Sequence, residues 1–271
     1  MRHVKETVVA GVVILVMFVI AGCGTMENGR GWGEDLVLRY EPKRLGKVVH
    51  DAFFDWQTIG PLLGAAVFAV DDFDEKASDW ATKHTPIFGS VEDAKDASDD
   101  LRRILRIEAL ATVILTPSGD ESDQWAASKA RGAGVEVGAY LLTDGLTNGL
   151  KDWTDRQRPD ESGDNSFPSG HSSQSFAFAT LSNRNLDYID VPWGLRRPLQ
   201  VTNIALASGV AWARVEGQRH YPSDVLFGAA LGHFATRIVH DYFLDLPEDD
   251  RFDLRIRVSD RGAMLETAFA F

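Results

Sequence analysis

The segment from Arg214 to Asp224 contains residue types that could form and stabilise a bond to phosphorus. Pro222 suits the first position of a helix, which would place Asp224 in the first turn, where a carboxylate is favoured. From there the carboxylate can reach back to His220, fix the tautomer of its imidazole and leave the other ring nitrogen free to attack phosphorus. Arg214 adds a planar guanidinium that fits phosphate oxygens. Taken alone, these residues also fit a structural helix cap with a surface arginine nearby.

The segment from Pro168 to His171 predicts a loop that turns sharply into a helix. The first N–H groups of a helix have no partners within it and lie at the positive end of its dipole, so they can bind phosphate oxygens. Gly170 allows close approach of the backbone, and His171 lies beside it as a candidate proton donor. An ordinary N-cap at Ser169, next to a surface histidine, is the alternative.

Two cations, Lys151 and Arg158, are separated by six residues near an expected helix end. Pro159 predicts that end, because a proline disfavours the helical conformation in the residue before it. The two side chains could face a single anion. On its own, however, such a pair is more often part of a solvated helix face.

The three segments together carry more information than each does alone. Lys-x6-Arg-Pro, Pro-Ser-Gly-His and Arg-x5-His-x3-Asp follow one another within 74 residues. This order resembles the signature of the type 2 phosphatidic acid phosphatase family, whose fold is shared with the vanadium haloperoxidases. The resemblance implies a mostly α-helical bundle and a phosphatase that cleaves a phosphomonoester or a pyrophosphate through a phosphohistidine.

The resemblance also implies a role for each matching residue. His220 would be the nucleophile, Asp224 its orienting partner, and His171 the acid that protonates the leaving oxygen. The phosphate-binding residues would be Lys151, Arg158, Ser169, Gly170 and Arg214. No metal and no other cofactor is implied, and vanadate should bind as a mimic of phosphate.

The chain departs from the family at Ala213, where the family usually has serine. A hydrogen bond beside the phosphate is thereby lost, and we expect altered activity at this position and not its loss. The seven histidines show no spacing typical of a zinc site. His233 and His240 are predicted to be packing or surface residues.

Two other functions fit the same residues. A vanadate-dependent haloperoxidase would hold vanadate through His220, although the short chain argues against it. A non-catalytic envelope lipoprotein could retain the pocket as a relic, although every charged position of the three segments is present. The residues do not choose among phosphatidic acid, phosphatidylglycerophosphate, isoprenyl pyrophosphate, lipid A and soluble phosphoesters.

The N-terminus is typical of a secreted lipoprotein. Arg2 and Lys5 precede an apolar run over 8–20, as in a signal peptide. The run ends before Cys23, the sole cysteine, in a sequence that resembles the bacterial lipobox, where such a cysteine is lipidated. Gly24 follows the cysteine, and in lipoproteins the absence of aspartate there favours the periplasmic face of the outer membrane. An uncleaved anchor helix is the alternative.

Composition limits the partners of the chain. The 271 residues include 40 acidic and 28 basic side chains, for a formal charge of −12, which argues against nucleic acid as a partner. One cysteine excludes an intrachain disulfide and a cysteine-rich zinc site. We therefore expect a phosphorylated lipid or a small phosphoester as substrate, and a membrane contacted through the N-terminal lipid.

The mature chain is predicted to be mostly helical. Apolar patterns predict helices over 59–70, 101–115, 125–153 (interrupted), 171–181, 199–215 and 222–244. Alternation after residue 251 predicts a β-hairpin. Asp71, Asp72, Asp74 and Glu75 are predicted to be a solvated acidic run at the start of a helix, and the run over 93–100 is predicted to be an exposed charged face. The predicted organisation is a signal peptide over 1–22, a lipidated tether over 23–34, a helical phosphatase domain over 35–248 and the hairpin over 249–271. No second apolar run is long enough to span a bilayer.

Overall fold

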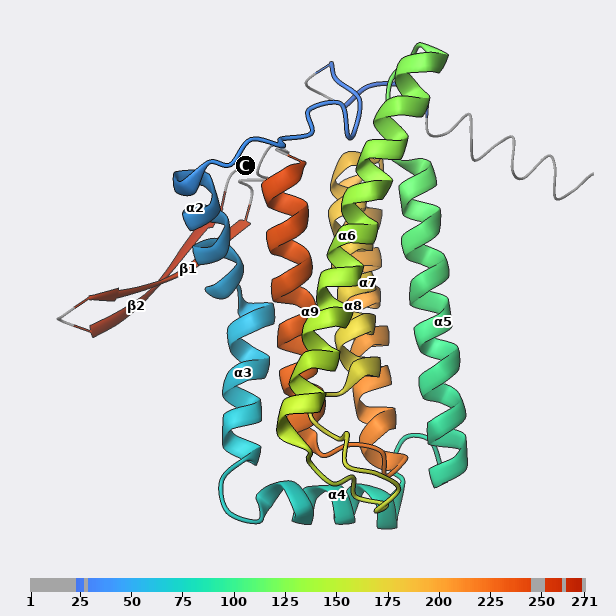
Figure 1. The fold of residues 1–271 in the computed structure, drawn as a ribbon, viewed down its shortest axis with the longest axis vertical. Coiled ribbons are helices and arrows are strands. Elements are labelled where there is room, and N and C mark those ends of the chain that lie inside the picture. Colours follow the sequence, from blue (N-terminus) through green and yellow to red (C-terminus); the bar gives the residue numbers. More distant parts are fainter. Residues whose placement is uncertain (1–22, 27–28, 245–251, 260–261, 270–271) are drawn as a thin grey trace, which may run out of the picture.

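A computed structural model describes residues 23–26, 29–244, 252–259 and 262–269 of the chain. The predicted signal peptide lies outside this range. The described residues form eight helices, which Figure 1 shows as a bundle: α2 (Pro42–Phe53), α3 (Trp56–Phe68), α4 (Phe73–His84), α5 (Val91–Leu115), α6 (Ser122–Thr154), α7 (Gly170–Tyr188), α8 (Trp193–Glu216) and α9 (Pro222–Phe243). None of them is both long enough and apolar enough to cross a membrane.

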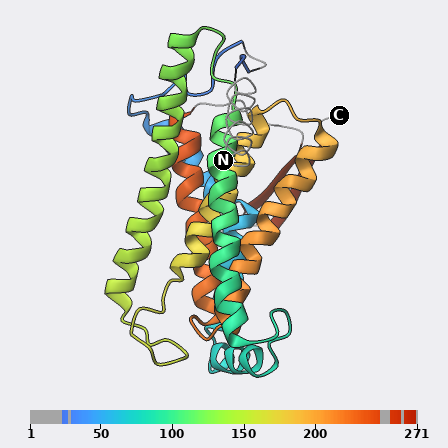
Figure 2. The same cartoon turned by 90° about the vertical axis from the view of Figure 1, so that its right-hand side faces the viewer.

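The long helices surround α7 and α9. Helix α7 packs against α5, α6, α8 and α9, while α9 also packs against α2 and α3. In Figure 2, α8 is inclined to its neighbours, and the loop between α6 and α7 lies at the same end of the bundle as α4. The main apolar core includes Leu105, Phe176, Val210 and Val225, which come from four helices. The prediction of a mostly α-helical bundle is confirmed.

Two glycines on α9 allow α7 to approach closely. A Cβ added at Gly228 would lie 2.7 Å from the carbonyl oxygen of Ser169, and one at Gly232 would lie 2.1 Å from that of Ser173. Real Cβ atoms do not come this close, so larger residues would push the two helices apart. The close contact places the N-terminus of α7 beside that of α9. The Pro-Ser-Gly-His segment and the segment from Arg214 to Asp224 lie there.

The predicted interruption between residues 125 and 153 is wrong, because α6 is continuous over 33 residues. Added Cβ atoms at Gly134, Gly138, Gly145 and Gly149 would meet nothing within 4 Å. These glycines lower helix propensity by about 1 kcal/mol each relative to alanine, without breaking the helix. Helix α2 was not predicted, and only the acidic start of α4 was expected, since both helices are short and rich in charged residues.

Helix α4 lies across one end of the bundle (Figure 1). The carboxylate of Glu216, at the end of α8, accepts the backbone N–H groups of Ile87 and Phe88, each at 3.0 Å. The turn that follows α4 is thereby fixed to α8. Because α4 closes the end where the predicted site residues gather, its inward-facing side chains become part of that site.

Part of the predicted tether packs onto the helical domain. Trp32 is fully buried and lies against Gly132, and Met26 belongs to the same small core. Gly24 forms backbone hydrogen bonds with Gly119, in the turn between α5 and α6. The domain boundary at residue 35 and the lipidation of Cys23, an exposed residue, stay predictions.

The C-terminal residues include two segments assigned as strands, β1 (Phe252–Ser259) and β2 (Gly262–Phe269). They pair antiparallel, with Phe252 opposite Phe269. The turn that would join them, at residues 260 and 261, lies outside the described range. The hairpin therefore stays a prediction.

Candidate active site

The three sequence segments meet at the end of the bundle that α4 covers. Lys151 comes from the last turn of α6, Arg158 from the following loop, Ser169, Gly170 and His171 from the start of α7, Arg214 from the end of α8, His220 from the next turn, and Asp224 from the first turn of α9. As predicted, Pro222 is the first residue of α9. Every predicted catalytic and phosphate-binding residue thus belongs to one region.

The cations of this region are only partly neutralised. Arg214 donates from Nη1 to Ser98 Oγ at 3.2 Å, and Lys151 donates from Nζ to the carbonyl oxygen of Asn165 at 2.6 Å. The Nε atoms of Arg158 and Arg214 are buried and lack a hydrogen-bond partner among the described residues. Buried donors without partners are costly, so these two favour an incoming acceptor.

Electrostatics show the same imbalance. Burial, together with the positive charges of Arg158 and Arg214, lowers the pKa of Lys151 to about 8. Burial, Arg219 and Arg158 lower the pKa of Arg214 to about 10. The cations therefore destabilise one another. An anion placed among them would relieve this repulsion.

His220 is buried and held in one tautomer. Its Nδ1 lies 2.7 Å from the carbonyl oxygen of Ser166, which can only accept a hydrogen bond. The proton is therefore on Nδ1, and Nε2 carries the lone pair. Burial, followed by the charges of Arg214, Lys151 and Arg158, holds the pKa of His220 well below its usual value. A neutral imidazole in this state is a nucleophile.

Asp224 approaches His220 without a hydrogen bond to it. Its Oδ2 is 3.9 Å from Nδ1 of the imidazole, and it accepts instead from Ser166 Oγ at 2.5 Å and from the backbone N–H of Tyr221 at 2.9 Å. Ser166 therefore links the two, through its hydroxyl to the carboxylate and through its carbonyl to the imidazole. The expected direct contact is replaced by this bridge, and the orienting role of Asp224 stays a prediction.

His171 pairs with an aspartate of α5. Its Nε2 lies 2.9 Å from Oδ1 of Asp99, which also accepts from Arg102 at 3.0 Å. Burial, followed by the charge of Arg214, lowers the pKa of His171 to about 4, although Asp99 opposes this shift. His171 is therefore neutral at pH 7. Asp99 was predicted to be merely solvated. It is exposed, but it also contacts a site residue.

The start of α7 is a helix cap, and it also lies where a phosphate-binding turn was predicted. Ser169 is the N-cap, and its Oγ accepts the backbone N–H of Ser172 at 3.4 Å. The backbone N–H of Ser169 donates to the carbonyl oxygen of Asp224 at 3.0 Å. A Cβ added at Gly170 would lie 3.8 Å from Cε of Lys151. The cap is thus directly beside a cation of the site, and phosphate binding by this turn stays a prediction.

The prediction that all four residues of the acidic group at 71–75 are solvated is wrong for Asp74. This residue is 4% exposed, and its carboxylate accepts from Arg156 Nη2 at 2.8 Å and from the backbone N–H of Ser223 at 2.9 Å. Asp74 faces the bundle because α4 lies across its end. The acidic residues predict a helix start here, but not that α4 lies across the bundle, and the three sequence segments do not point to Arg156, Ser166 or Asp74.

Ala213 is fully buried in α8, where the family usually has serine. The hydroxyl that contacts the neighbouring Arg214 comes from Ser98 of α5. The described residues contain no group of three or more histidine, cysteine, aspartate or glutamate side chains that could hold a metal ion. The absence of a metal from the reaction stays a prediction.

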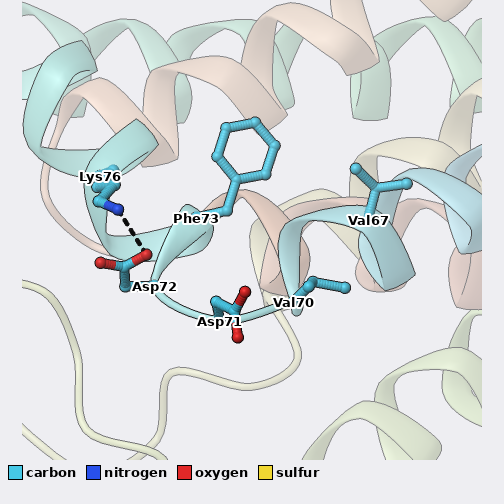
Figure 3. A pocket seen from close by; sticks show the side chains of 6 residues that line it. All are labelled: Val67, Val70, Asp71, Asp72, Phe73 and Lys76. Carbon is cyan, nitrogen blue, oxygen red and sulfur yellow. Dashed lines mark hydrogen bonds and ion pairs between the residues drawn. The ribbon is translucent and has the colours of Figure 1, made fainter.

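A separate hollow lies at the turn between α3 and α4. Figure 3 shows its lining, which is Val67, Val70, Asp71, Asp72, Phe73 and Lys76, with an ion pair of 2.7 Å between Lys76 and Asp72. None of the predicted site residues lines it. Its walls are largely apolar, and its one cation is already paired, so it does not resemble an anion site.

Comparisons with known proteins agree with the geometry. Residues 134–247 match the family model of the PAP2 superfamily, and this range includes every predicted catalytic and phosphate-binding residue. A stretch of 92 residues is 41% identical to the lipid A 1-phosphatase of Porphyromonas gingivalis, and it covers 34% of this chain but only 19% of that protein.

The fold is similar to that of a solved structure. The crystal structure of a transmembrane PAP2 type phosphatidylglycerolphosphate phosphatase from Bacillus subtilis matches with a TM-score of 0.52 and 19% identity, over 68% of this chain and 94% of that one. This match shows a similar fold, while the family-model match and the similarity to the lipid A 1-phosphatase confirm the predicted family resemblance.

Proposed function

We propose that this chain, whose residues 134–247 match the family model of the PAP2 superfamily, is a phosphatase that hydrolyses a phosphomonoester or pyrophosphate through a phosphohistidine. One observation carries the proposal. The neutral, buried His220 is surrounded by Lys151, Arg158 and Arg214, and the two arginines have buried Nε donors without partners among the described residues. A phosphoryl group supplies both the electrophile for the imidazole and the acceptors for these donors.

The first step forms the phosphohistidine. The lone pair of His220 Nε2 attacks phosphorus, and the bond from phosphorus to the leaving oxygen breaks. The leaving oxygen takes a proton from the imidazolium of His171. Because Nε2 of His171 is bonded to Asp99, the transferred proton comes from Nδ1. The negative charge of the substrate raises the pKa of His171, which makes protonation possible at neutral pH.

The second step releases phosphate. A water molecule gives a proton to the now neutral His171, and its oxygen attacks phosphorus. The bond between phosphorus and Nε2 breaks, which returns His220 to its neutral form. Lys151, Arg158 and Arg214 neutralise the equatorial oxygens in both steps. The chemistry is therefore expected to proceed without a metal, and vanadate should inhibit by taking the place of the transferred phosphoryl group.

A phosphorylated lipid is the substrate class that the similar proteins favour. Their names specify lipid A and phosphatidylglycerolphosphate as what they act on. The predicted lipid on Cys23 would keep this chain in the bacterial cell envelope, on the periplasmic face of the outer membrane.

The predicted lipid anchor and the phosphate site lie at opposite ends of α6. Gly24 is hydrogen-bonded to Gly119 before the helix begins, whereas Lys151 is in its last turn. At 1.5 Å per residue, α6 is about 50 Å long. If α6 stood perpendicular to the membrane that holds the predicted lipid anchor, the site would therefore lie at the end of the bundle far from that membrane. Substrate assays should offer the lipid in separate vesicles and in mixed micelles, beside a soluble ester.

The test is phosphate release by the full chain in the presence of a chelator. We expect release that vanadate inhibits and that His220→Ala abolishes, while the control His50→Ala, an exposed histidine on α2, keeps full activity. Brief incubation with a 32P-labelled substrate should give an acid-labile, base-stable label in the wild-type chain. Hydrolysis that survives His220→Ala would rule out the mechanism. Halide oxidation with vanadate and peroxide tests the haloperoxidase alternative.

A further inference from the structure

Arg156 lies in sequence between two predicted phosphate ligands, but its guanidinium contacts carboxylates. Nη1 donates to Oδ1 of Asp224 at 2.6 Å, and Nη2 donates to Oδ2 of Asp74 at 2.8 Å. Nη1 also lies 2.8 Å from Ser223 Oγ, and the guanidinium carbon is 4.3 Å from the centre of the Tyr221 ring. The guanidinium of Arg156 is thus bound on two sides by aspartates and is stacked on an aromatic ring.

Asp74 fixes the first turn of α9 from the opposite side. Its carboxylate accepts the backbone N–H of Ser223 at 2.9 Å and also contacts the Ser223 hydroxyl. An acceptor at the N-terminus of a helix satisfies a backbone donor that has no partner within the helix. Helix α4 is in this way joined to the start of α9, directly after the turn that carries the predicted nucleophile, His220.

The contacts continue to the imidazole. Asp224 holds the hydroxyl of Ser166, and the carbonyl oxygen of Ser166 holds Nδ1 of His220. The path runs from Asp74 through Arg156 and Asp224 to Ser166, and ends at the ring. We propose that Arg156, held by Asp74, is a positioning residue that fixes the orientation of His220 and does not bind phosphate. This inference rests on the proposed function.

The charges explain why an arginine is needed here. Asp74 and Asp224 are 4% and 0% exposed, so two negative charges would otherwise repel each other in a buried space. A guanidinium bridges two carboxylates with separate N–H groups, which a lysine ammonium cannot do in the same planar geometry. Both aspartates raise the pKa of Arg156 against the effect of burial. Arg156 therefore stays positively charged and neutralises the two buried aspartates.

The test separates positioning from phosphate binding through kcat, KM and inhibition by inorganic phosphate. In Arg156→Ala, misplacement of the nucleophile should lower kcat by about 100-fold, while KM and the phosphate inhibition constant stay within about threefold. Arg156→Lys should be almost as impaired, and added guanidinium ion should restore activity to Arg156→Ala only. Arg214→Ala should instead weaken phosphate inhibition. Arg103→Ala, an exposed arginine on α5, is the matched control.

Wild type and His220→Ala are measured first, so failure of the proposed function is recognised before the Arg156 variants are assessed. Thermal melting and circular dichroism check that each variant is folded. If Arg156→Ala does not fold, Asp74→Asn provides the second variant, and it should lower kcat without changing phosphate inhibition. Weakened phosphate inhibition in either variant, or unchanged kcat in a folded one, would overturn the inference.

Discussion

Binding of a phosphate mimic should raise the pKa of His171 by several units. In the structure this pKa is about 4, because burial and the charge of Arg214 disfavour the imidazolium. The proposed mechanism requires the imidazolium in the first step. The substrate itself must therefore supply the negative charge that stabilises the imidazolium of His171 and so raises its pKa.

The size of this shift follows from Coulomb's law. One negative charge about 4 Å from the imidazolium, at an effective dielectric constant of about 20, stabilises it by about 4 kcal/mol. A shift of one pKa unit corresponds to about 1.4 kcal/mol, so a single charge raises the pKa by about 3 units. His171 would then titrate near pH 7 in the complex, which suits a general acid at neutral pH.

The shift can be measured by NMR with 15N-labelled histidine, by titrating the free chain and its vanadate complex. His171→Asn identifies the resonance. The pH profile gives an independent measure, because kcat/KM reports the free enzyme and kcat the complex. We expect kcat to fall above about pH 7 as His171 loses its proton. In Asp99→Asn the pKa of His171 should be lower in both states, since Asp99 raises it.

A pKa of His171 that stays near 4 in the vanadate complex would refute this reasoning. The group that protonates the leaving oxygen would then have to be another one. A pKa near 7 already in the free chain would show that burial and the charge of Arg214 do not act on His171 as the structure indicates.

Three further predictions concern the site and the bundle. Arg214→Ala should raise KM and weaken phosphate inhibition by about 10- to 100-fold, the equivalent of one charge-assisted hydrogen bond, while Arg103→Ala should change neither. Gly232→Ala would place a Cβ 2.1 Å from a backbone oxygen of α7 and should cost about 1–3 kcal/mol in urea unfolding, whereas Gly134→Ala, in open space, should be neutral or stabilising. Burial raises the pKa of Glu136 to about 8, above its unfolded value of about 4.3. The free energy of unfolding should therefore fall between those pH values, and Glu136→Gln should flatten this dependence.

The helix starts that were predicted correctly depend on a few consecutive residues. Pro222 and Asp224 begin α9, and Ser169 caps α7, because proline, aspartate and serine have strong local preferences at helix starts. The order of the three segments also carried the family resemblance. Local patterns of this kind were enough to place each predicted residue at a helix end or in a turn.

The remaining site residues could not be predicted, because their contacts join distant segments. Asp74 binds Ser223, which is 149 positions away, and Asp99 binds His171 across 72 positions. Neither aspartate has a distinctive neighbourhood in the sequence. Asp74 is buried only because α4 lies across the end of the bundle, and nothing in the acidic sequence of α4 indicates that position.

The contrast between the acidic chain and its cationic site shows how the phosphate must be recognised. The formal charge of −12 repels anions at long range, but this repulsion is screened beyond about 8–10 Å at physiological salt. Recognition must therefore come from cations at the site itself. The segment from Lys151 to Arg158 supplies three of them, and they have different neighbours in the structure. Lys151 and Arg158 remain near His220, while Arg156 between them is paired with Asp74 and Asp224. The six unspecified residues of the motif thus include a third cation, Arg156, which neutralises the buried carboxylates of Asp74 and Asp224 next to His220.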